Sequence, residues 1–207
     1  MKKPSRMKAK PTTRRTTSYL PWRTATGLID KLENEDRPDD ALLVAAGIYF
    51  GLRISDILSL TWGNLRSSRF EIIEQKTGKR RRIDVHPDFA EIRLRVEKQM
   101  TAAGGGAPPD DALAFPGRWG KRSGKVLTVA GANYRLKSAL ERHSIETENP
   151  SSHTLRKTFA RRVWEKNGRD GAALVLLSDI LGHSNTKVTR RYLGITEEHH
   201  ASVYTNL

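Results

Sequence analysis

Apolar positions recur with a helical period along most of the chain. The longest apolar run, 41–50, lies between the acidic pair Asp39 and Asp40 and the helix-breaking Gly51. This pattern predicts a buried helix that is capped by the two aspartates and ends at the glycine. An amphipathic pattern upstream predicts a helix that follows Pro21. The same period predicts further helices from about 55, over 87–100, 129–143, 152–167 and 171–182, and over 184–193 with Ser184 as its cap.

One segment departs from this helical period. Residues 69–75 have the length and β-rich composition of a strand, 76–79 have the composition of a tight turn, and 80–85 alternate as a returning strand. The glycine- and proline-rich stretch 104–109 is the most loop-like part of the interior sequence. The pattern therefore predicts an α+β fold that is mostly α-helical, with a small antiparallel β-hairpin near its first third.

Composition narrows the chemistry that such a fold could carry. The chain has 207 residues, enough for one ordinary core, and its 37 Lys and Arg against 23 Asp and Glu give a net charge of +14, which indicates a polyanionic partner. The absence of cysteine excludes disulfides, zinc fingers, iron–sulfur clusters and thiol catalysis. No apolar run approaches the ~20 residues of a membrane helix, and no secretory signal is evident, so we expect a cytoplasmic protein without a membrane partner.

Positive charge is concentrated at the N-terminus. Residues 1–18 carry seven Lys or Arg and no acid, and we expect them to form a flexible basic arm. The arm is either a solvated tail or a segment that orders on the phosphates of nucleic acid, in which case Arg14 and Arg15 are candidate DNA contacts. The composition becomes globular at Tyr19, so we expect 19–207 to form one domain.

Four segments contain residues that could carry chemistry. Arg53 lies between a glycine and an apolar helix, and Lys76 lies at the tip of the predicted hairpin. His153 and Arg156 share one face at a helix N-terminus, where an anion is favoured. His183 follows a glycine, and Tyr192 follows nine residues later. Each segment also has an ordinary structural explanation: a solvated arginine, a turn lysine, a surface His–Arg pair and a core tyrosine.

Together, these side chains could form a phosphodiester site. Two arginines can hold the non-bridging oxygens of one phosphate and neutralise the charge of a pentacoordinate transition state. A tyrosine hydroxyl, with an ordinary pKa of ~10, can attack phosphorus if cations stabilise the phenolate and a base accepts its proton. A lysine can protonate the leaving oxygen. No carboxylate or histidine cluster has the spacing of a metal site, so no metal or other cofactor is expected.

In this order, the four segments resemble the signature of the tyrosine recombinases, the phage integrase family. Each element is weak by itself, but their conjunction across about 140 residues is highly specific. The resemblance implies the catalytic-domain fold of these enzymes. The matching elements are Gly51-Leu-Arg-Ile-Ser-Asp-Ile, Lys76-Thr-Gly-Lys79, His153-Thr-Leu-Arg156, and Leu181-Gly-His-Ser184 with Tyr192.

The resemblance implies a role for each of six residues and a 3′-phosphotyrosyl intermediate that is rejoined without metal or ATP. The lysine at position 79 is a rival for the lysine role, although Lys76 matches the family position better. Lys79 and Arg80 are also candidate DNA contacts. In the implied roles, Arg53 and Arg156 bind the scissile phosphate, Lys76 protonates the leaving 5′ oxygen, His153 is the acid/base at the tyrosine, His183 hydrogen-bonds a phosphate oxygen, and Tyr192 is the nucleophile.

The chain also departs from the family pattern. Asp56 stands where a glutamate is common, and both can accept hydrogen bonds behind the first arginine. Lys157 stands where a histidine is frequent. No separate core-binding domain is evident before the catalytic region, so the sequence is either a minimal, catalytic-domain-only recombinase or part of a longer one.

The activity that the resemblance implies is site-specific, integrase-like DNA recombination. The implied partners are double-stranded DNA and further copies of the chain in a tetramer, with an accessory DNA-bending protein as a further candidate. The C-terminal segment would be exchanged between copies, with Val203 and Leu207 as apolar anchors. Two alternatives stay open: a type IB topoisomerase-like nicking-closing enzyme, and a DNA-binding regulator of the same fold that does not cleave.

Overall fold

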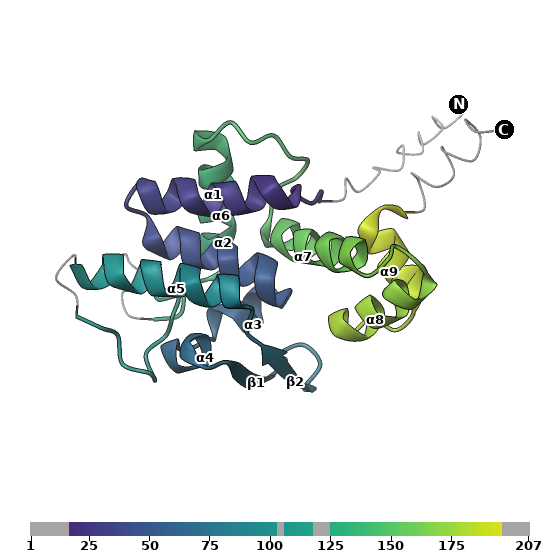
Figure 1. Ribbon diagram of the computed structural model, residues 1–207, viewed down its shortest axis with the longest axis horizontal. Helices are drawn as coiled ribbons and strands as arrows, with labels where there is room; N and C mark the ends of the chain where they lie inside the picture. The colour runs from purple at the N-terminus through teal and green to yellow at the C-terminus, as the bar shows by residue number, and fades with distance from the viewer. Residues whose placement is uncertain (1–16, 103–105, 118–124, 196–207) are drawn as a thin grey trace, which may run out of the picture.

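In the computed structural model, the helices pack together and a small hairpin lies at one edge of them (Figure 1). The structure describes residues 17–102, 106–117 and 125–195. Its fold class is the predicted one, mostly α-helical with one two-stranded antiparallel sheet. The helices are α1 (Trp22–Asn34), α2 (Pro38–Phe50), α3 (Ile54–Leu58), α4 (Trp62–Arg66), α5 (Pro87–Met100), α6 (Val129–Arg142), α7 (Ser152–Lys166), α8 (Gly171–Leu181) and α9 (Thr186–Leu193), and the strands are β1 (Arg69–Ile73) and β2 (Arg80–Asp84).

Helix α2 forms the centre of the larger core. Its sequence is apolar all round, and it is buried along almost its whole length by α1, α5, α6 and α7. Gly47 allows α7 to approach closely, because a Cβ there would lie 2.6 Å from the Leu155 Cβ. Helix α7 is therefore seated directly on α2, and its N-terminal turn is fixed in place.

Two local predictions, both of helix caps, were wrong. Helix α2 begins at Pro38, so Asp39 and Asp40 lie buried in its first turn and do not cap it. The cap of α9 is Asn185, whose side chain accepts a hydrogen bond from Val188 N, and not the preceding serine. The helix expected from about 55 is confirmed as α3, which begins at Ile54, and a further short helix, α4, starts after the extended Thr61. Thr61 forms a capping box with α4, and this local bond favours a new start over a continuous helix.

A second, smaller hydrophobic cluster covers the C-terminal half of α7. It joins Ala160 of α7 to Leu177 and Leu181 of α8 and Leu193 of α9, whereas Leu155 of α7 belongs to the larger core. In Figure 1, α8 and α9 extend from the end of α7, away from α1 and α5. One helix thus connects the two clusters.

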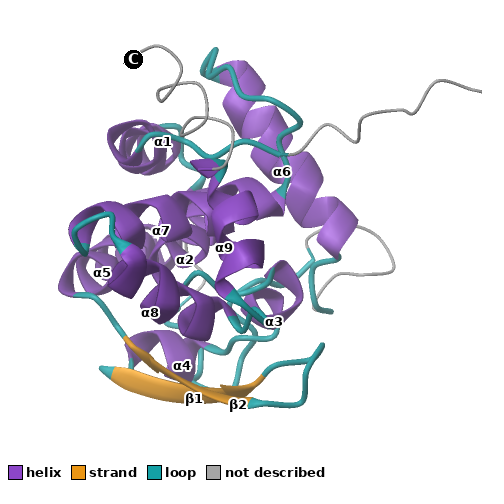
Figure 2. Cartoon of the chain, turned by 90° about the vertical axis from the view of Figure 1, so that its right-hand side faces the viewer, coloured by secondary structure: helices purple, strands orange, loops and turns teal. Residues whose placement is uncertain are grey.

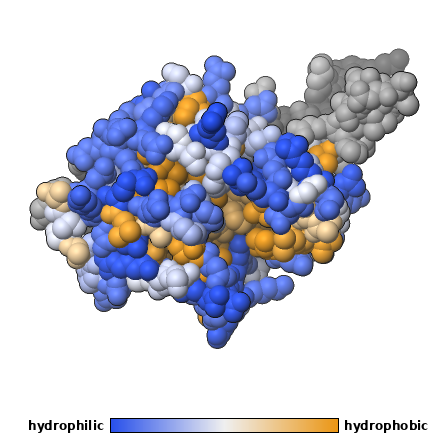
Figure 3. All heavy atoms as spheres, in the orientation of Figure 1, coloured by the Kyte–Doolittle hydropathy of each residue, from blue (hydrophilic) through white to orange (hydrophobic). Residues whose placement is uncertain are grey.

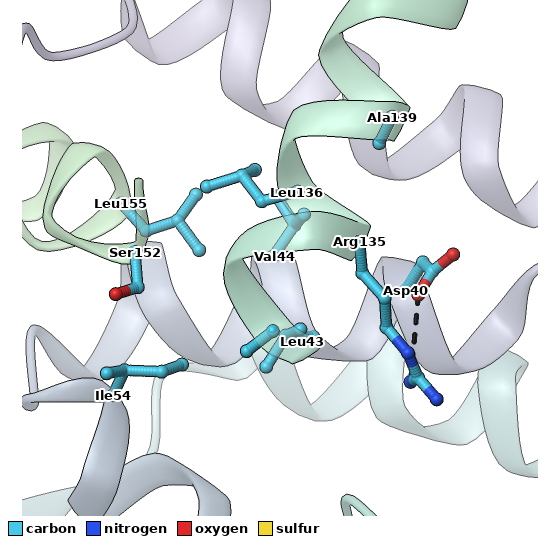
Figure 4. Close-up of a pocket in the computed structure, with 10 residues that line it drawn as sticks. Asp40, Leu43, Val44, Ile54, Arg135, Leu136, Ala139, Ser152 and Leu155 are labelled. Atoms are coloured by element: carbon cyan, nitrogen blue, oxygen red, sulfur yellow. Dashed lines mark ion pairs between the residues drawn. The ribbon is translucent and has the colours of Figure 1, made fainter. Parts of the chain in front are cut away.

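The contact between α2, α6 and α7 supports the start of α7. Figure 4 shows Leu43, Leu136 and Leu155 meeting there, with the Arg135 guanidinium 3.7 Å from the Asp40 carboxylate at one side. Figure 2 shows the hairpin at one edge of the molecule, next to α4. Within the described ranges, no helix combines the length and the apolar character needed to cross a bilayer.

We expect Gly51→Ala to destabilise the fold by about 3 kcal/mol, measured by urea unfolding. Gly51 ends α2 at a φ of +56°, and a Cβ there would lie 2.1 Å from Phe159 Cδ1. The matched control is Gly78→Ala, where φ is +67° but no atom lies within 4 Å of the added Cβ. This control should lose only about 1 kcal/mol. Equal losses of unfolding free energy in the two variants would show that the clash with Phe159 does not contribute to the destabilisation.

Candidate functional site

Four of the six predicted site residues line one cleft of about 240 Å³. Arg53 comes from the start of α3, Lys76 from the hairpin turn, and His153 and Arg156 from the first turns of α7. These segments are far apart in sequence, and the packing of α7 on α2 brings them together. The cleft therefore combines two guanidiniums, an amine and an imidazole.

Arg156 is the most buried of these residues, at 4% exposed. Its Nη1 donates to Gly51 O at 2.9 Å, and its Nη2 donates to Leu181 O at 2.7 Å. Burial lowers the pKa of Arg156 to about 10, with a further contribution from the positive charge of Arg53, so the group keeps its charge at neutral pH. No carboxylate forms an ion pair with it within the described part of the chain. Its hydrogen bonds go to uncharged carbonyls, and Glu74 acts on it through charge alone, which leaves it suited to an anion.

Arg53 is held by a carboxylate that the sequence analysis did not identify. Its Nη1 donates to Glu74 Oε2 at 2.8 Å, the same oxygen that accepts from Thr77 Oγ1 at 2.7 Å. Arg81 Nη1 lies 3.4 Å from the other oxygen, Glu74 Oε1. Burial by itself would raise the pKa of Glu74, but the hydrogen bonds from Thr77 and Arg53 and the two positive charges outweigh it and lower the pKa below its ordinary value.

Lys76 is placed by the turn that Glu74 begins. The Glu74 carbonyl accepts from the backbone N–H of Thr77 and of Gly78, which closes the turn around the lysine. Asp56, fully buried in α3, accepts from Gln75 N at 2.9 Å and so joins the turn to the helix that begins beside Arg53. Lys76 itself is exposed and lines the cleft, and Lys79 does not.

Tyr192 packs on the second hydrophobic cluster with His183 against its ring, and the cleft residues Arg156 and Arg53 act on both. The two rings meet edge to face with centroids 5.3 Å apart, and His183 Nδ1 lies 2.9 Å from Thr189 Oγ1. The Tyr192 hydroxyl is buried and forms no regular hydrogen bond with any described residue. Burial raises the pKa of Tyr192 to about 12, although the charge of Arg156, its interaction with the hydroxyl and the charge of Arg53 act in the opposite direction.

Both site histidines favour the neutral form. The pKa of His153 is lowered, first by partial burial of its ring and then by Arg156 and the other cations around it. The pKa of His183 is lowered by burial and by the positive charges of Arg156 and Arg53. A neutral imidazole can accept a proton, so His153 can act as a base at neutral pH.

The sequence analysis missed Glu74 and Arg81. Glu74 was included in a strand, and Arg81 was one of three consecutive arginines in the returning strand. The position of Glu74 next to the turn is the only local signal. Its contact with Arg53 spans 21 residues and exists only in the folded chain.

The candidate DNA contacts fall outside the cleft. Lys79 and Arg80 are exposed and line a neighbouring groove of about 510 Å³, where Arg80 Nη1 lies 3.0 Å from Glu71 Oε2. Arg14 and Arg15 lie outside the described residues, as do Val203 and Leu207. In the described part of the chain, no three His, Asp or Glu side chains lie close enough to hold a metal ion together.

The sequence profile of the phage integrase family matches residues 23–199. The chain belongs to the phage integrase family. A curated relative is the tyrosine recombinase XerC of Pseudomonas fluorescens, 30% identical over 154 residues, which are 74% of this chain and 47% of XerC. The chain thus spans about half the length of such a relative.

Solved structures of phage integrase family members share its fold. The crystal structure of XerA recombinase superposes with a TM-score of 0.65 at 18% identity, over 96% of this chain and 65% of XerA. A lambda integrase tetramer bound to a Holliday junction gives a TM-score of 0.61 at 17% identity, over 89% of this chain and 49% of the integrase chain. The expected tyrosine recombinase catalytic-domain fold is confirmed.

We expect Glu74→Gln to lower the free energy of unfolding by about 3 kcal/mol at pH 7, because it leaves Arg53 and Arg81 together without their carboxylate. The pKa of Glu74 is lower in the folded chain than its ordinary 4.5, so its contribution is complete above about pH 5 and is lost as pH falls through the folded-state pKa. Urea unfolding of both proteins between pH 3 and about pH 8 measures this difference.

The control is Glu71→Gln on the same strand. Glu71 pairs with the exposed Arg80, where solvent screens the charges, so the loss should be below about 0.5 kcal/mol at every pH. A loss for Glu74→Gln that is no larger than this, or that does not depend on pH, would show that the carboxylate does not offset the arginine charges.

Proposed function

We propose that this chain is the catalytic domain of a site-specific DNA recombinase that cleaves and rejoins DNA through a phosphotyrosine. The observation that carries the proposal is the cleft, in which Arg53, Arg156, Lys76 and His153 converge from three separate segments. Family membership supports the same reaction class. A cleft of this size, with three cations and one neutral base, suits a single phosphate of a DNA backbone.

The proposed reaction is a transesterification in which each group has one task. The guanidiniums of Arg53 and Arg156 bind the non-bridging oxygens and offset the charge that develops at phosphorus. The Tyr192 oxygen forms the new bond to phosphorus while its proton passes to His153. The bond to the 5′ oxygen breaks, and Lys76 supplies the proton that this oxygen gains. His183 donates a hydrogen bond to a phosphate oxygen. Because the bond energy stays in the phosphotyrosine, rejoining needs no ATP.

The buried nucleophile favours a site that is inactive until DNA is bound. The high pKa of Tyr192 keeps the phenol neutral, and bound phosphate would draw the two arginines toward the reacting oxygens. The proposed partners are double-stranded DNA and further copies of the chain, as in the lambda integrase tetramer on a Holliday junction. Residues 1–18 are proposed to act as a basic arm that contacts DNA, and 19–207 as the catalytic unit.

We expect a covalent DNA adduct that depends on Tyr192 and resists EDTA. The chain is mixed with a library of nicked duplexes, denatured in SDS, and the attached strands are sequenced. Tyr192→Phe should abolish the adduct, and the control Tyr134→Phe, which removes an exposed phenol of α6, should retain it. An adduct that persists in Tyr192→Phe would refute the proposed nucleophile. Adducts without a preferred sequence would favour the topoisomerase-like alternative.

The role of Lys76 can be separated from that of Lys79 with a modified substrate. Lys76→Ala should slow cleavage by about 10²-fold or more, because the 5′ oxygen leaves without a proton. A duplex with sulfur at the bridging 5′ position should restore the rate to within about tenfold, since a thiolate is a good leaving group without protonation. Lys79→Ala should cleave both substrates normally. If Lys79→Ala, and not Lys76→Ala, cleaves the ordinary duplex slowly and the sulfur-containing duplex at a restored rate, then Lys79 is the residue that protonates the leaving oxygen.

A further inference from the structure

A lysine lies on the ring face of the proposed nucleophile. Lys157 Nζ is 5.2 Å from the centroid of the Tyr192 ring. Lys157 is partly buried in α7, and burial lowers its pKa. No carboxylate forms an ion pair with it within the described residues. A partly desolvated ammonium without a carboxylate is unfavourable, so the contact with the ring is the attraction that offsets this cost.

Several other charged or titratable groups face Tyr192 besides Lys157. Arg156 and His153 face the site from α7, Arg53 from the start of α3, and His183 from the loop before α9. The carboxylate near these groups, Glu74, is already bonded to Arg53 and Arg81. Arg156 donates to two backbone carbonyls and also acts on the Tyr192 hydroxyl.

The effect of Lys157 should grow as the phenol ionises. A cation over a neutral aromatic ring is attracted by the negative ring face. When the hydroxyl loses its proton, part of the negative charge spreads into the ring, and the attraction becomes one between opposite charges in a site with little water. Arg156 is the cation that faces the buried Tyr192 oxygen, and Lys157 adds a second cation at a different place, the ring face.

We propose that Lys157 is a positioning residue for Tyr192, which keeps the ring in place and stabilises its phenolate from the ring face. This inference rests on the proposed role of Tyr192 as the nucleophile. Lys157 keeps its own proton throughout, and the phenol proton still passes to His153. Lys157 stands where a histidine is frequent in the family, so the proposed stabilisation of the Tyr192 ring by an ammonium is a feature of this chain.

The test measures ionisation at position 192 directly and needs no DNA. Tyr192 is replaced by a ring-fluorinated tyrosine, whose phenol is more acidic than that of tyrosine and whose ¹⁹F resonance reports its ionisation in the full chain. Its pKa is then compared among proteins with the native Lys157, Lys157→Met and Lys157→Arg. The control Lys166→Met removes an exposed lysine at the other end of the same helix.

We expect Lys157→Met to raise the fluorotyrosine pKa by about one unit, a tenfold change in the ionisation constant. Lys157→Arg, which stays charged at every pH of the titration, and Lys166→Met should both leave it within about 0.3 unit of the native value. Equal pKa values in Lys157→Met and the native protein would overturn the proposal. If Lys157→Met does not fold, Lys157→Gln is judged by the same criterion.

A second measurement separates this inference from the proposed function. With unmodified Tyr192, Lys157→Met should form the DNA adduct about tenfold more slowly at unchanged DNA affinity, and Lys157→Arg should restore the rate. An unchanged adduct rate would overturn the proposal even if the fluorotyrosine pKa moved. Failure of the native chain to form any adduct would refute the proposed function, whereas the ¹⁹F titration would still report the contact between Lys157 and the ring.

Discussion

The Arg156 guanidinium connects the two hydrophobic clusters, and the site depends on this connection. One of its nitrogens is bound by the carbonyl that ends α2, and another by the last carbonyl of α8, so a single buried charge fixes the position of the second cluster against the first. Charged hydrogen bonds of this kind are strong and directional. Tyr192 packs on the second cluster and meets the His183 ring, whereas Arg53 follows Leu52 of the first cluster, so their relative positions depend on this side chain.

Such an arrangement gathers positive charge, and one carboxylate offsets it. Arg53, Arg81 and Arg156 lie close enough to influence one another, and Glu74 bonds to the first two while its backbone begins the turn that carries Lys76. Charge balance and the placement of the proposed acid thus depend on the same residue. The surplus of positive charge that remains is what a phosphate would neutralise.

The exposed surface over α8, in the second cluster, is more apolar than the rest of the same face. Figure 3 shows apolar atoms gathered over the region of α8, where Val175 and Leu176 are 53% and 45% exposed. Elsewhere on this face polar and charged side chains predominate. The short α8–α9 unit buries a small cluster against one half of α7 and depends on that helix and on Arg156 for its position.

Local pattern determined most of the elements by itself. The helical period, the β-rich hairpin and the glycine at the end of α2 predict nearly all helices and both strands, because these features depend on neighbouring residues. The order of four short motifs also identified the family and the candidate residues Arg53, Lys76, His153, Arg156, His183 and Tyr192.

Tertiary structure alone decided how these residues meet. The sequence did not show that Glu74 pairs with Arg53, that Arg156 bridges two clusters, or that Lys157 lies over the Tyr192 ring. Arg156 and Lys157 reach their partners because α7 packs against α2, α8 and α9, and Glu74 reaches Arg53 because the hairpin turn lies beside α3. Burial, which raises the pKa of Tyr192, likewise exists only in the folded chain, so this pKa could not be predicted from residue types.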